Sequence, residues 1–428
     1  MNSKLQREVN ELLQAEVITP QVAEDISAYY ASKKTGKEST NTLLTIFGIL
    51  GSLLVGLGVI LILAHNWDQF PRSVKTFFSF VPLVIGQLIA AYAIFKKKGS
   101  AWREGAATFL FFAIGASISL ISQVYNIPGS MQVYLLTWIL LAAPLIYLLR
   151  SHAASILYLL FITIYACNVG YFNDMSPWWY LALLCVIAPQ YYMQIKNAPN
   201  SAITNVYHWL IPLSVLISLG AFVSGEEFIG FLMYISLFGL FYNIGKLPFF
   251  QHLRLRANGY LLLGSLGTII TLMFMTFSWI WKEFDPGLVS SQDTFITIVL
   301  ALAAIGVLAY LHLKKHLTEF NLFQYAFIIF GLIYFMAPLG EELPKILTNL
   351  LVFGLGIFAI RIGAKQERFS ILNYGLLIIT ALISCRFFDL DISFVIRGLL
   401  FVLIGVGFFV ANFLMYKKQQ NLNIENHE

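Results

Sequence analysis

The sequence has few charged residues and very few cysteines, and each shortage excludes a class of protein. Of its 428 residues, 11% are charged and 58% are hydrophobic. A soluble domain carries about 25% charged residues, so most of this chain has lipid as its solvent. Cys167, Cys185 and Cys385 lie within apolar stretches and form no CxxC pair. A disulfide framework and a zinc site are therefore not expected, and no cofactor is implied.

Catalytic and targeting motifs are also missing. The N-terminus, MNSKLQREVNELL, is polar with a helical pattern, so no cleavable signal peptide is expected. No GxGxxG, P-loop, HExxH or GxSxG motif stands in a usable context. His65 has no His or Cys partner at ligand spacing, so no metal site is expected there. Loops reach at most about a dozen residues, which leaves no room for an extramembrane catalytic domain, and no nucleic-acid partner is indicated.

The stretch from Thr42 to Lys75 shows the pattern that recurs along the chain, an uncharged apolar span followed by a short polar segment. Its first 23 residues, TLLTIFGILGSLLVGLGVILILA, carry no charge; as a helix they cover the roughly 30 Å hydrocarbon core of a bilayer. Gly48, Ser52 and Gly56 are spaced four apart, and this small-residue stripe allows another helix to pack closely. The apolar run leads into the polar and aromatic segment HNWDQFPR.

Apolar spans and short polar connections alternate to the end of the chain. The sequence therefore predicts an all-α, polytopic transmembrane helical bundle over residues 42–416 with about 14 spans, and 12 or 13 spans remain alternatives. The expected spans are 42–64, 75–95, 104–124, 131–149, 153–173, 177–195, 205–223, 228–245, 257–281, 293–313, 321–338, 343–363, 369–386 and 392–416. The neighbouring spans that meet near residue 150, and those that meet near residue 175, are separated by only two or three residues for a turn.

Residues 1–41 form the one segment with a water-soluble pattern. Apolar residues recur at helical spacing and predict a short hairpin, Ser3–Ala15 and Pro20–Ser32, with Thr19 as N-cap of the second helix. Its core is small, so the hairpin either docks on the membrane domain or a protein partner, or serves as a solubilising tail. The last residues, 417–428, are expected to be disordered.

The distribution of Lys and Arg predicts the orientation. With an even number of spans, one side of the membrane holds 21 of the 27 basic residues and the other holds five, with Arg397 inside the last span. The positive-inside rule places the richer side, with both termini, in the cytoplasm. The opposite face is acidic, with Asp68, Glu341, Glu342, Asp389 and Asp391 among its residues.

Polar residues on the predicted outer face are the candidate binding residues, because ionisable groups at membrane depth are expensive unless paired or hydrated. Arg397 lies about five residues into the last span, which is roughly 7–8 Å along the helix axis. Its guanidinium either pairs with Asp389 or Asp391, or holds a phosphate or carboxylate. The full candidate substrate-binding set is Asp68, Arg72, Gln123, Tyr125, Asn126, Arg386, Asp389, Asp391 and Arg397.

Structural alternatives stand beside these binding roles. Asp68 and Arg72 are one helical turn apart, so an internal ion pair accounts for both if the segment is helical. Trp67 and Tyr125 fit interfacial anchors. Gln123 and Asn126 cap helix carbonyls or line a polar cavity. Glu341 and Glu342 fit an acidic pair that stabilises a helix N-terminus.

Three segments together resemble the bacterial multi-pass membrane proteins of domain-of-unknown-function family 2157. They are the hairpin LLQAEVITPQVAEDISAYY, the glycine-rich first span running into AHNWDQFP, and SQVYNIPGSMQVYLLTWILLAAPLIYLL. Val17 departs from the glycine expected in the hairpin turn. The resemblance implies a protein of the bacterial cytoplasmic (inner) membrane and no catalytic residue.

Three functions remain open. A transporter or flippase-like carrier of a polar or lipid-linked substrate fits the number of spans and the short loops. A non-catalytic scaffold, assembly factor or sensor fits the lack of a convergent site. An outer-face, glycosyltransferase-like enzyme would use Asp68 as the acid and Arg72, Arg386 and Arg397 to hold a phosphate. The partners expected are the lipid bilayer, a lipid-linked or anionic small molecule at the outer face, and a protein partner for residues 1–41.

Overall fold

The computed structural model describes residues 9, 11–15, 17–34, 67–173, 175–223, 227–251, 253–283, 291–315 and 320–389, with scattered positions between 395 and 417. Every regular element in this part of the chain is an α-helix or a 3-10 helix. The expected first span, 42–64, and most of the last, 392–416, lie outside the described residues, as does the tail from 418 onward. The chain forms two compact units, residues 1–78 and residues 79–428.

The first unit contains the second helix of the expected hairpin. Residues 11–14 are helical, and α2 follows as Pro20–Lys34. Thr19 has the expected N-cap position, because its Oγ1 accepts a hydrogen bond from the Val22 N–H at 3.4 Å. A short 3-10 helix, η1 (Trp67–Gln69), precedes α4 (Arg72–Phe95), which continues into the second unit.

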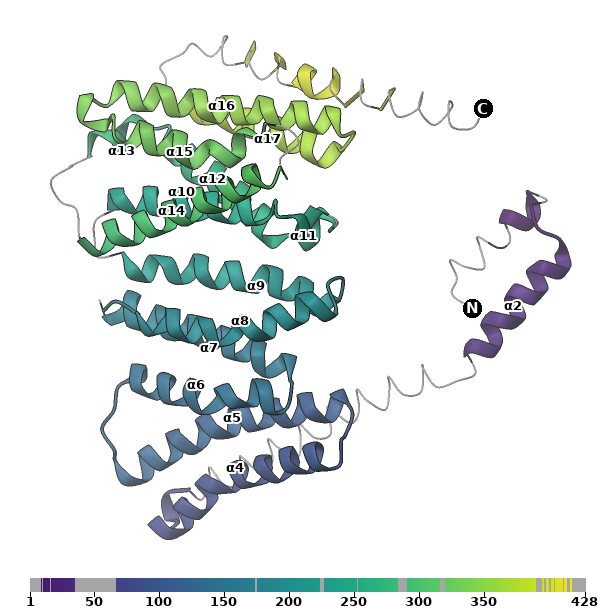
Figure 1. Ribbon diagram of the computed structural model, residues 1–428, viewed down its shortest axis with the longest axis vertical. Helices are drawn as coiled ribbons and strands as arrows, with labels where there is room; N and C mark the ends of the chain where they lie inside the picture. Colours follow the sequence, from purple (N-terminus) through teal and green to yellow (C-terminus); the bar gives the residue numbers. More distant parts are fainter. Residues whose placement is uncertain are drawn as a thin grey trace. The chain divides into compact units, whose positions relative to one another are not determined.

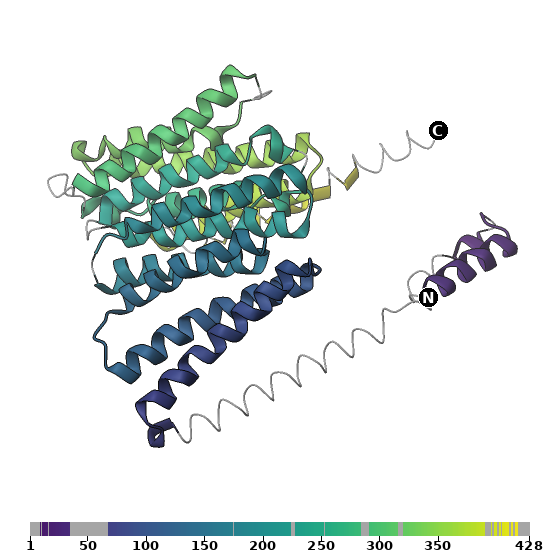
Figure 2. The same cartoon turned by 60° about the horizontal axis from the view of Figure 1, so that its bottom comes forward.

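The second unit is a stack of helices that run back and forth (Figures 1 and 2). In chain order they are α5 (Ser100–Tyr125), α6 (Met131–Leu148), α7 (His152–Asn173), α8 (Trp179–Asn197), α9 (Ala202–Leu219), α10 (Glu227–Ile244), α11 (Pro248–Gln251), α12 (Gly259–Phe274), α13 (Ser278–Lys282), α14 (Ser291–Leu313), α15 (Leu322–Tyr334), α16 (Glu342–Lys365) and α17 (Phe369–Asp389). Each expected span from 75–95 to 369–386 except 257–281 overlaps one of these helices, and separate helices do meet near residues 150 and 175.

Eight helices of the described part are long and apolar enough to cross a membrane, and three shorter apolar helices accompany them. The all-α, multi-span fold predicted from the sequence is therefore confirmed, whereas the count of 14 spans stays a prediction. Two expected spans end early. α12 has 16 residues and α15 has 13, which correspond to about 24 Å and 20 Å of helix and fall short of the hydrocarbon core.

The break after α12 shows why an interrupted helix is tolerated. The turn at Met275–Phe277 frees backbone carbonyls, and side chains satisfy them: Trp281 Nε1 donates to the Met275 carbonyl at 2.7 Å, and Asn349 Nδ2 donates to the Thr276 carbonyl at 3.1 Å. Irregular backbone at membrane depth persists only where such partners exist. The expected span 257–281 is therefore two helices, α12 and α13.

Buried apolar residues divide the second unit into two halves. One core cluster lies mainly within α5–α8 and another within α10 and α12–α17, and a smaller third cluster draws on α9, α10, α11 and α12. α16 and α17 cross at glycines: a Cβ on Gly363 would lie 2.3 Å from the Leu372 backbone nitrogen, and one on Gly375 would lie 2.6 Å from the Ile360 nitrogen. Backbone contacts this close require glycine.

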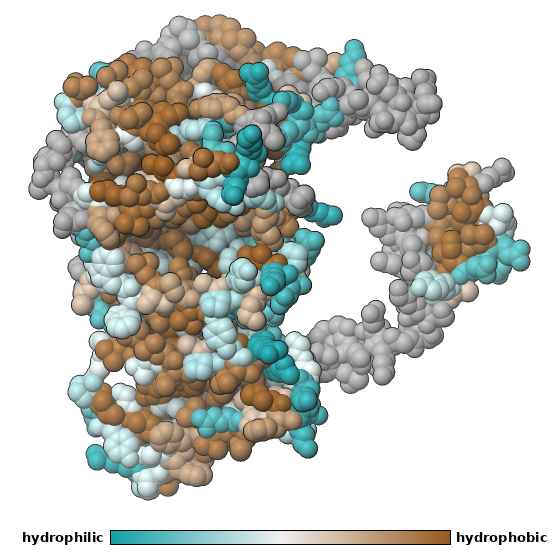
Figure 3. All heavy atoms as spheres, in the orientation of Figure 1, coloured by the Kyte–Doolittle hydropathy of each residue, from teal (hydrophilic) through white to brown (hydrophobic). Residues whose placement is uncertain are grey.

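The outer surface of the helices is apolar (Figure 3). Ile270, Leu302 and Leu350 are each more than half exposed, and a water-soluble protein rarely exposes apolar surface on this scale. Alternate turns lie at the same end of the stack, so the basic turns at residues 96–98, 314–315 and 365–368 share one end (Figure 1). Hydrophilic residues gather along that end in Figure 3.

Candidate functional site

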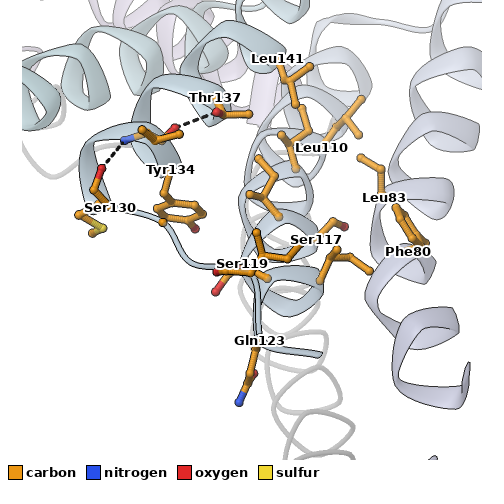
Figure 4. Close-up of a pocket in the computed structure, with 18 of the residues that line it drawn as sticks. Phe80, Leu83, Leu110, Ser117, Ser119, Gln123, Ser130, Tyr134, Thr137 and Leu141 are labelled. Carbon is orange, nitrogen blue, oxygen red and sulfur yellow. Dashed lines mark hydrogen bonds between the residues drawn. The ribbon is translucent and has the colours of Figure 1, made fainter. Parts of the chain in front are cut away.

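The candidate site is a cavity of about 1270 Å³ along α4, α5 and α6. α5 lies between the other two helices, with Phe80 and Leu83 of α4 on one side and Tyr134 and Thr137 of α6 on the other (Figure 4). The α6 lining residues include Met131, Tyr134, Leu141, Pro144 and Leu148. Their spacing of three, four or seven positions puts them on one helix face, so the cavity follows nearly the whole length of α6.

The contact between α5 and α6 depends on a glycine and on the packing of a tryptophan ring. A Cβ on Gly115 would lie 2.3 Å from the Trp138 ring, so glycine is what lets this indole lie against α5. Trp138 Nε1 donates to the Phe111 carbonyl at 2.7 Å, and the Tyr134 hydroxyl donates to the Gly115 carbonyl at 3.1 Å. On the other side, Ser117 Oγ donates to the Ser79 carbonyl of α4 at 2.8 Å. Hydrogen bonds therefore fix α5 to both of its neighbours, α4 and α6.

Most polar groups in the lining already have partners within the protein. Thr137 Oγ1 donates to the Val133 carbonyl at 2.7 Å, Ser122 Oγ donates to the Ile127 carbonyl at 3.0 Å, and Ser130 Oγ accepts from the Val133 N–H at 3.3 Å. No charged side chain occurs among the lining residues that the structure describes. The cavity is thus an apolar channel with neutral polar groups, which are densest where α5 ends and α6 begins.

Among the predicted substrate-binding residues whose side chains the structure describes, Gln123 is the one that lines this cavity. Its side chain extends away from the apolar part, at the end of α5 (Figure 4). Tyr125 is exposed and ends α5. Asn126 is the C-cap of α5 in a left-handed conformation (φ 48°), and its backbone N–H bonds to the Gln123 carbonyl. Asn126 therefore caps the helix through its backbone.

The expected Asp68–Arg72 ion pair does not form. Ion pairs do form elsewhere in the described part of the chain, for example between Lys345 and Glu342. Asp68 lies in η1, whereas Arg72 is the first residue of α4, and Pro71 separates the two elements. A residue before proline is disfavoured in the helical region, so Asp68 and Arg72 never share a helix face.

Arg386 has a structural environment on α17. Its Nη2 donates to Thr276 Oγ1 at 3.1 Å, and its guanidinium lies 4.7 Å from the centroid of the Phe277 ring. These contacts attach α17 to the turn that interrupts α12. Asp389 is the last residue of α17, with a side chain outside the described part, and Asp391, Arg397 and His65 also lie outside it.

Glu341 and Glu342 have the structural contacts expected of an acidic pair at a helix start. Glu342 lies in the first turn of α16 and pairs with Lys345 at 2.7 Å, and Glu341 lies 3.8 Å from Lys282. Among the described residues, no group of three His, Cys, Asp or Glu side chains is arranged to hold a metal ion.

One acidic residue that the sequence did not single out has a clear structural role. Glu104 of α5 accepts hydrogen bonds from the backbone N–H groups of His152 (3.0 Å) and Ala153 (2.9 Å) and from the Ser151 hydroxyl. It therefore caps the N-terminus of α7 from a different helix. The only sequence signal was an acid early in an apolar span, four residues after Ser100.

Comparison with known proteins identifies the first third of the chain. Residues 10–155 match the family described as "Predicted membrane protein (DUF2157)". The resemblance drawn from the hairpin, AHNWDQFP and SQVYNIPGSMQVYLLTW segments is therefore confirmed, and the match includes α4, α5 and α6, which line the cavity. No curated protein and no solved structure gives a match. The protein is a membrane-embedded helical protein, and the family description names no activity.

Proposed function

We propose that this protein is a membrane carrier for an amphipathic, lipid-linked molecule whose hydrocarbon part lies in the cavity along α4, α5 and α6. The observation that carries the proposal is the composition of that cavity: a long apolar lining, neutral polar groups at one end, and no charged side chain among the described residues that line it.

The size of the cavity supports a large ligand. About 1270 Å³ exceeds the 300–1,000 Å³ of a typical small-molecule pocket. The α6 side of the lining runs from Met131 to Leu148, which is about 26 Å of helix, close to the thickness of the hydrocarbon core. A hydrocarbon chain that enters from the bilayer fits a channel of this length.

The lack of charge on the described lining residues indicates which part of the ligand lies inside. An anionic headgroup in an apolar cavity without a partner loses much of its solvation energy. The hydrocarbon chain therefore occupies the apolar stretch beside Leu83, Leu110 and Leu141, and the headgroup lies beyond Ser122 and Gln123, at the end of α5.

Two tryptophan substitutions on α6 test this function. Leu141 lines the cavity, whereas its neighbour Leu140 is equally exposed, at 50% compared with 55%, and does not line it. L141W fills the channel, and L140W adds the same ring to the surface of the same helix. The full chain is reconstituted in liposomes with a fluorescent polyprenyl phosphate, and probe movement between leaflets is followed by chemical quenching from outside.

The expected result is probe movement by the wild-type protein and by L140W, with a large loss in L141W. Equal rates in protein-free liposomes and wild-type liposomes would contradict a carrier function. Equal behaviour of L140W and L141W would contradict the location of the binding site, and an apolar protein helix in the channel would then be the better account of its lining.

The proposed setting is the cytoplasmic membrane of a bacterium, with both termini in the cytoplasm. The shared end of the basic turns supports this orientation through the positive-inside rule. Compartment-specific labelling is expected to place Lys97 in the cytoplasm and Glu342 outside. Labelling of both residues from one side would refute the proposed topology.

A further inference from the structure

The polar side chains that line the α4–α6 cavity divide into two groups. One group is bonded to backbone groups of the protein and comprises Ser117, Ser122, Ser130, Tyr134 and Thr137. The side chains of the other group line the cavity and form no hydrogen bond with a described residue; they belong to Gln87, Ser119 and Gln123. The second group is therefore available to a ligand.

Gln87 lies deep in the membrane-spanning part of α4. It is roughly 22 Å along the helix axis from Arg72, where α4 begins, and roughly 12 Å from Phe95, where α4 ends. A Cβ on the preceding residue, Gly86, would lie 2.9 Å from the Leu110 side chain, so α4 and α5 approach closely at this level. Gln87 is thus at the level of Leu110, within the hydrocarbon core of a bilayer.

The amide of Gln87 belongs to the cavity-facing side of α4. Phe80, Leu83 and Gln87 all line the cavity, and their spacing of three and four positions puts them on one helix face. Polar side chains inside a membrane face the protein interior or a cavity and mark substrate paths. A purely hydrocarbon ligand would leave the two amide N–H groups and the amide oxygen without partners. The position of Gln87 therefore indicates that a polar part of the ligand reaches this depth.

Ser119 and Gln123 extend the same polar series toward the end of α5. They are one helical turn apart on that helix, about 6 Å along its axis (Figure 4). Ser119 is in turn about 13 Å along the axis from Leu110, which marks the level of Gln87. A headgroup that rests beyond Gln123 therefore meets a neutral hydrogen-bonding side chain at the end of α5, one turn inside the cavity, and again deep in the bundle.

We infer that Gln87 binds the headgroup of the lipid-linked molecule while that headgroup crosses the membrane, with Gln123 and Ser119 as the preceding contacts. The inference rests on the proposed carrier function and assigns its polar path. The amide N–H groups donate to phosphate or hydroxyl oxygens, and the amide oxygen accepts from hydroxyl groups. Because the resting headgroup lies beyond Gln123, the bond to Gln87 forms only during transfer. It therefore accelerates transfer without tightening the initial binding.

Three variants of α4 test this role in the liposome assay with fluorescent polyprenyl phosphate. Q87L replaces the amide by an apolar side chain of similar size, and Q87N keeps an amide on a shorter stem. The double variant Q87L/L88Q moves the amide to the neighbouring position, since Leu88 is 65% exposed and does not line the cavity. The double variant has the amino-acid composition of the wild-type helix, so it controls for the general polarity of α4.

The maximal rate of probe transfer is expected to fall about tenfold in Q87L and in Q87L/L88Q, which corresponds to the loss of one hydrogen bond during transfer. The half-saturating probe concentration is expected to stay within about twofold of the wild-type value in both variants. Q87N is expected to have a rate between those of Q87L and the wild type. Thermal unfolding of the purified variants in detergent is expected to match that of the wild type, because the Gln87 side chain is exposed.

The failure of this inference differs from the failure of the carrier function. Wild-type transfer by Q87L, with L141W inactive, would overturn the role of Gln87 and leave the carrier function in place. A wild-type protein that moves no probe would remove both. A rate that falls in Q87L and recovers in Q87L/L88Q would show that the amide acts from the lipid-facing side of α4, as in a bond to a second copy of the chain, and would overturn the inference. So would a loss of rate in Q87L that accompanies a lower unfolding temperature.

Discussion

Replacement of Glu104 by alanine is expected to destabilise the whole helical stack, although the residue lies near the start of α5. The Glu104 carboxylate accepts three hydrogen bonds at the beginning of α7: one from the Ser151 hydroxyl and two from the backbone N–H groups of His152 and Ala153. α7 carries Tyr158 and Ile162, which are fully buried in the core of the α5–α8 half. A loss of order at its first turn is therefore transmitted to that core.

The magnitude follows from the bonds removed. A hydrogen bond to a charged group contributes about 1.5–3 kcal/mol, and loss of an N-cap costs about 0.5–2 kcal/mol. Ser151 keeps its own N-cap bond to the Ala154 N–H, and water reaches part of the Glu104 side chain, so the contributions do not add in full. E104A is expected to lower the free energy of unfolding by about 2–4 kcal/mol. E104Q keeps an acceptor oxygen and is expected to lose about half as much.

The assay is reversible unfolding of the purified protein in mixed micelles, with E342A as the matched control. Glu342 also lies in the first turn of a helix and also has a partner, Lys345 at 2.7 Å, but its own side chain is 69% exposed. Exposed pairs contribute about 0–1 kcal/mol. If E104A and E342A lowered the free energy of unfolding equally, and by less than about 1 kcal/mol, the cap would have no special role and the reasoning would be refuted.

Two further predictions concern stability. G363A is expected to destabilise the protein by several kcal/mol, because the added Cβ would lie 2.3 Å from the Leu372 backbone nitrogen. The control G306A in α14 places a Cβ with nothing within 4 Å and is expected to be neutral or to stabilise by up to about 1 kcal/mol. Unfolding of both variants in mixed micelles tests this difference, and equal effects would contradict the close crossing of α16 and α17. Burial lowers the pKa of the Lys246 ammonium, in the turn between α10 and α11, so the unfolded chain holds this proton more tightly than the folded one. Wild-type stability relative to K246M is therefore expected to rise as the pH increases from the lowered pKa toward the unfolded value of about 10.4, and a constant difference across that window would exclude the shift.

The sequence predicted the fold well because the bilayer imposes a strong length and composition rule on each helix. The helices α4 to α17 follow the expected spans closely, even where Arg150 is the only charge between α6 and α7. The rule does not reveal where a helix breaks. The stop after Phe274 depends on Trp281 and on Asn349, and the latter is 73 residues away from its partner Thr276.

The candidate site was less predictable, because its residues are brought together by packing between helices. The sequence drew attention to charged residues, whereas the described residues that line the cavity are uncharged. Gln123 was included for its place at the end of a span, whereas Tyr134 and Thr137 looked like ordinary residues of an apolar helix. Asp68 and Arg72 failed as an ion pair because the i, i+4 argument assumed one helix, and Pro71 prevents it.

Photo-crosslinking tests the central claim about the α4–α6 cavity most directly. A polyprenyl phosphate with a diazirine in its hydrocarbon chain is irradiated with the protein in nanodiscs, and the modified peptides are mapped by mass spectrometry. The account predicts adducts concentrated on the lining of α4, α5 and α6, reduced by unlabelled polyprenyl phosphate and lost in L141W. Adducts spread equally over lipid-facing side chains such as Leu302 of α14, and unchanged in L141W, would contradict it.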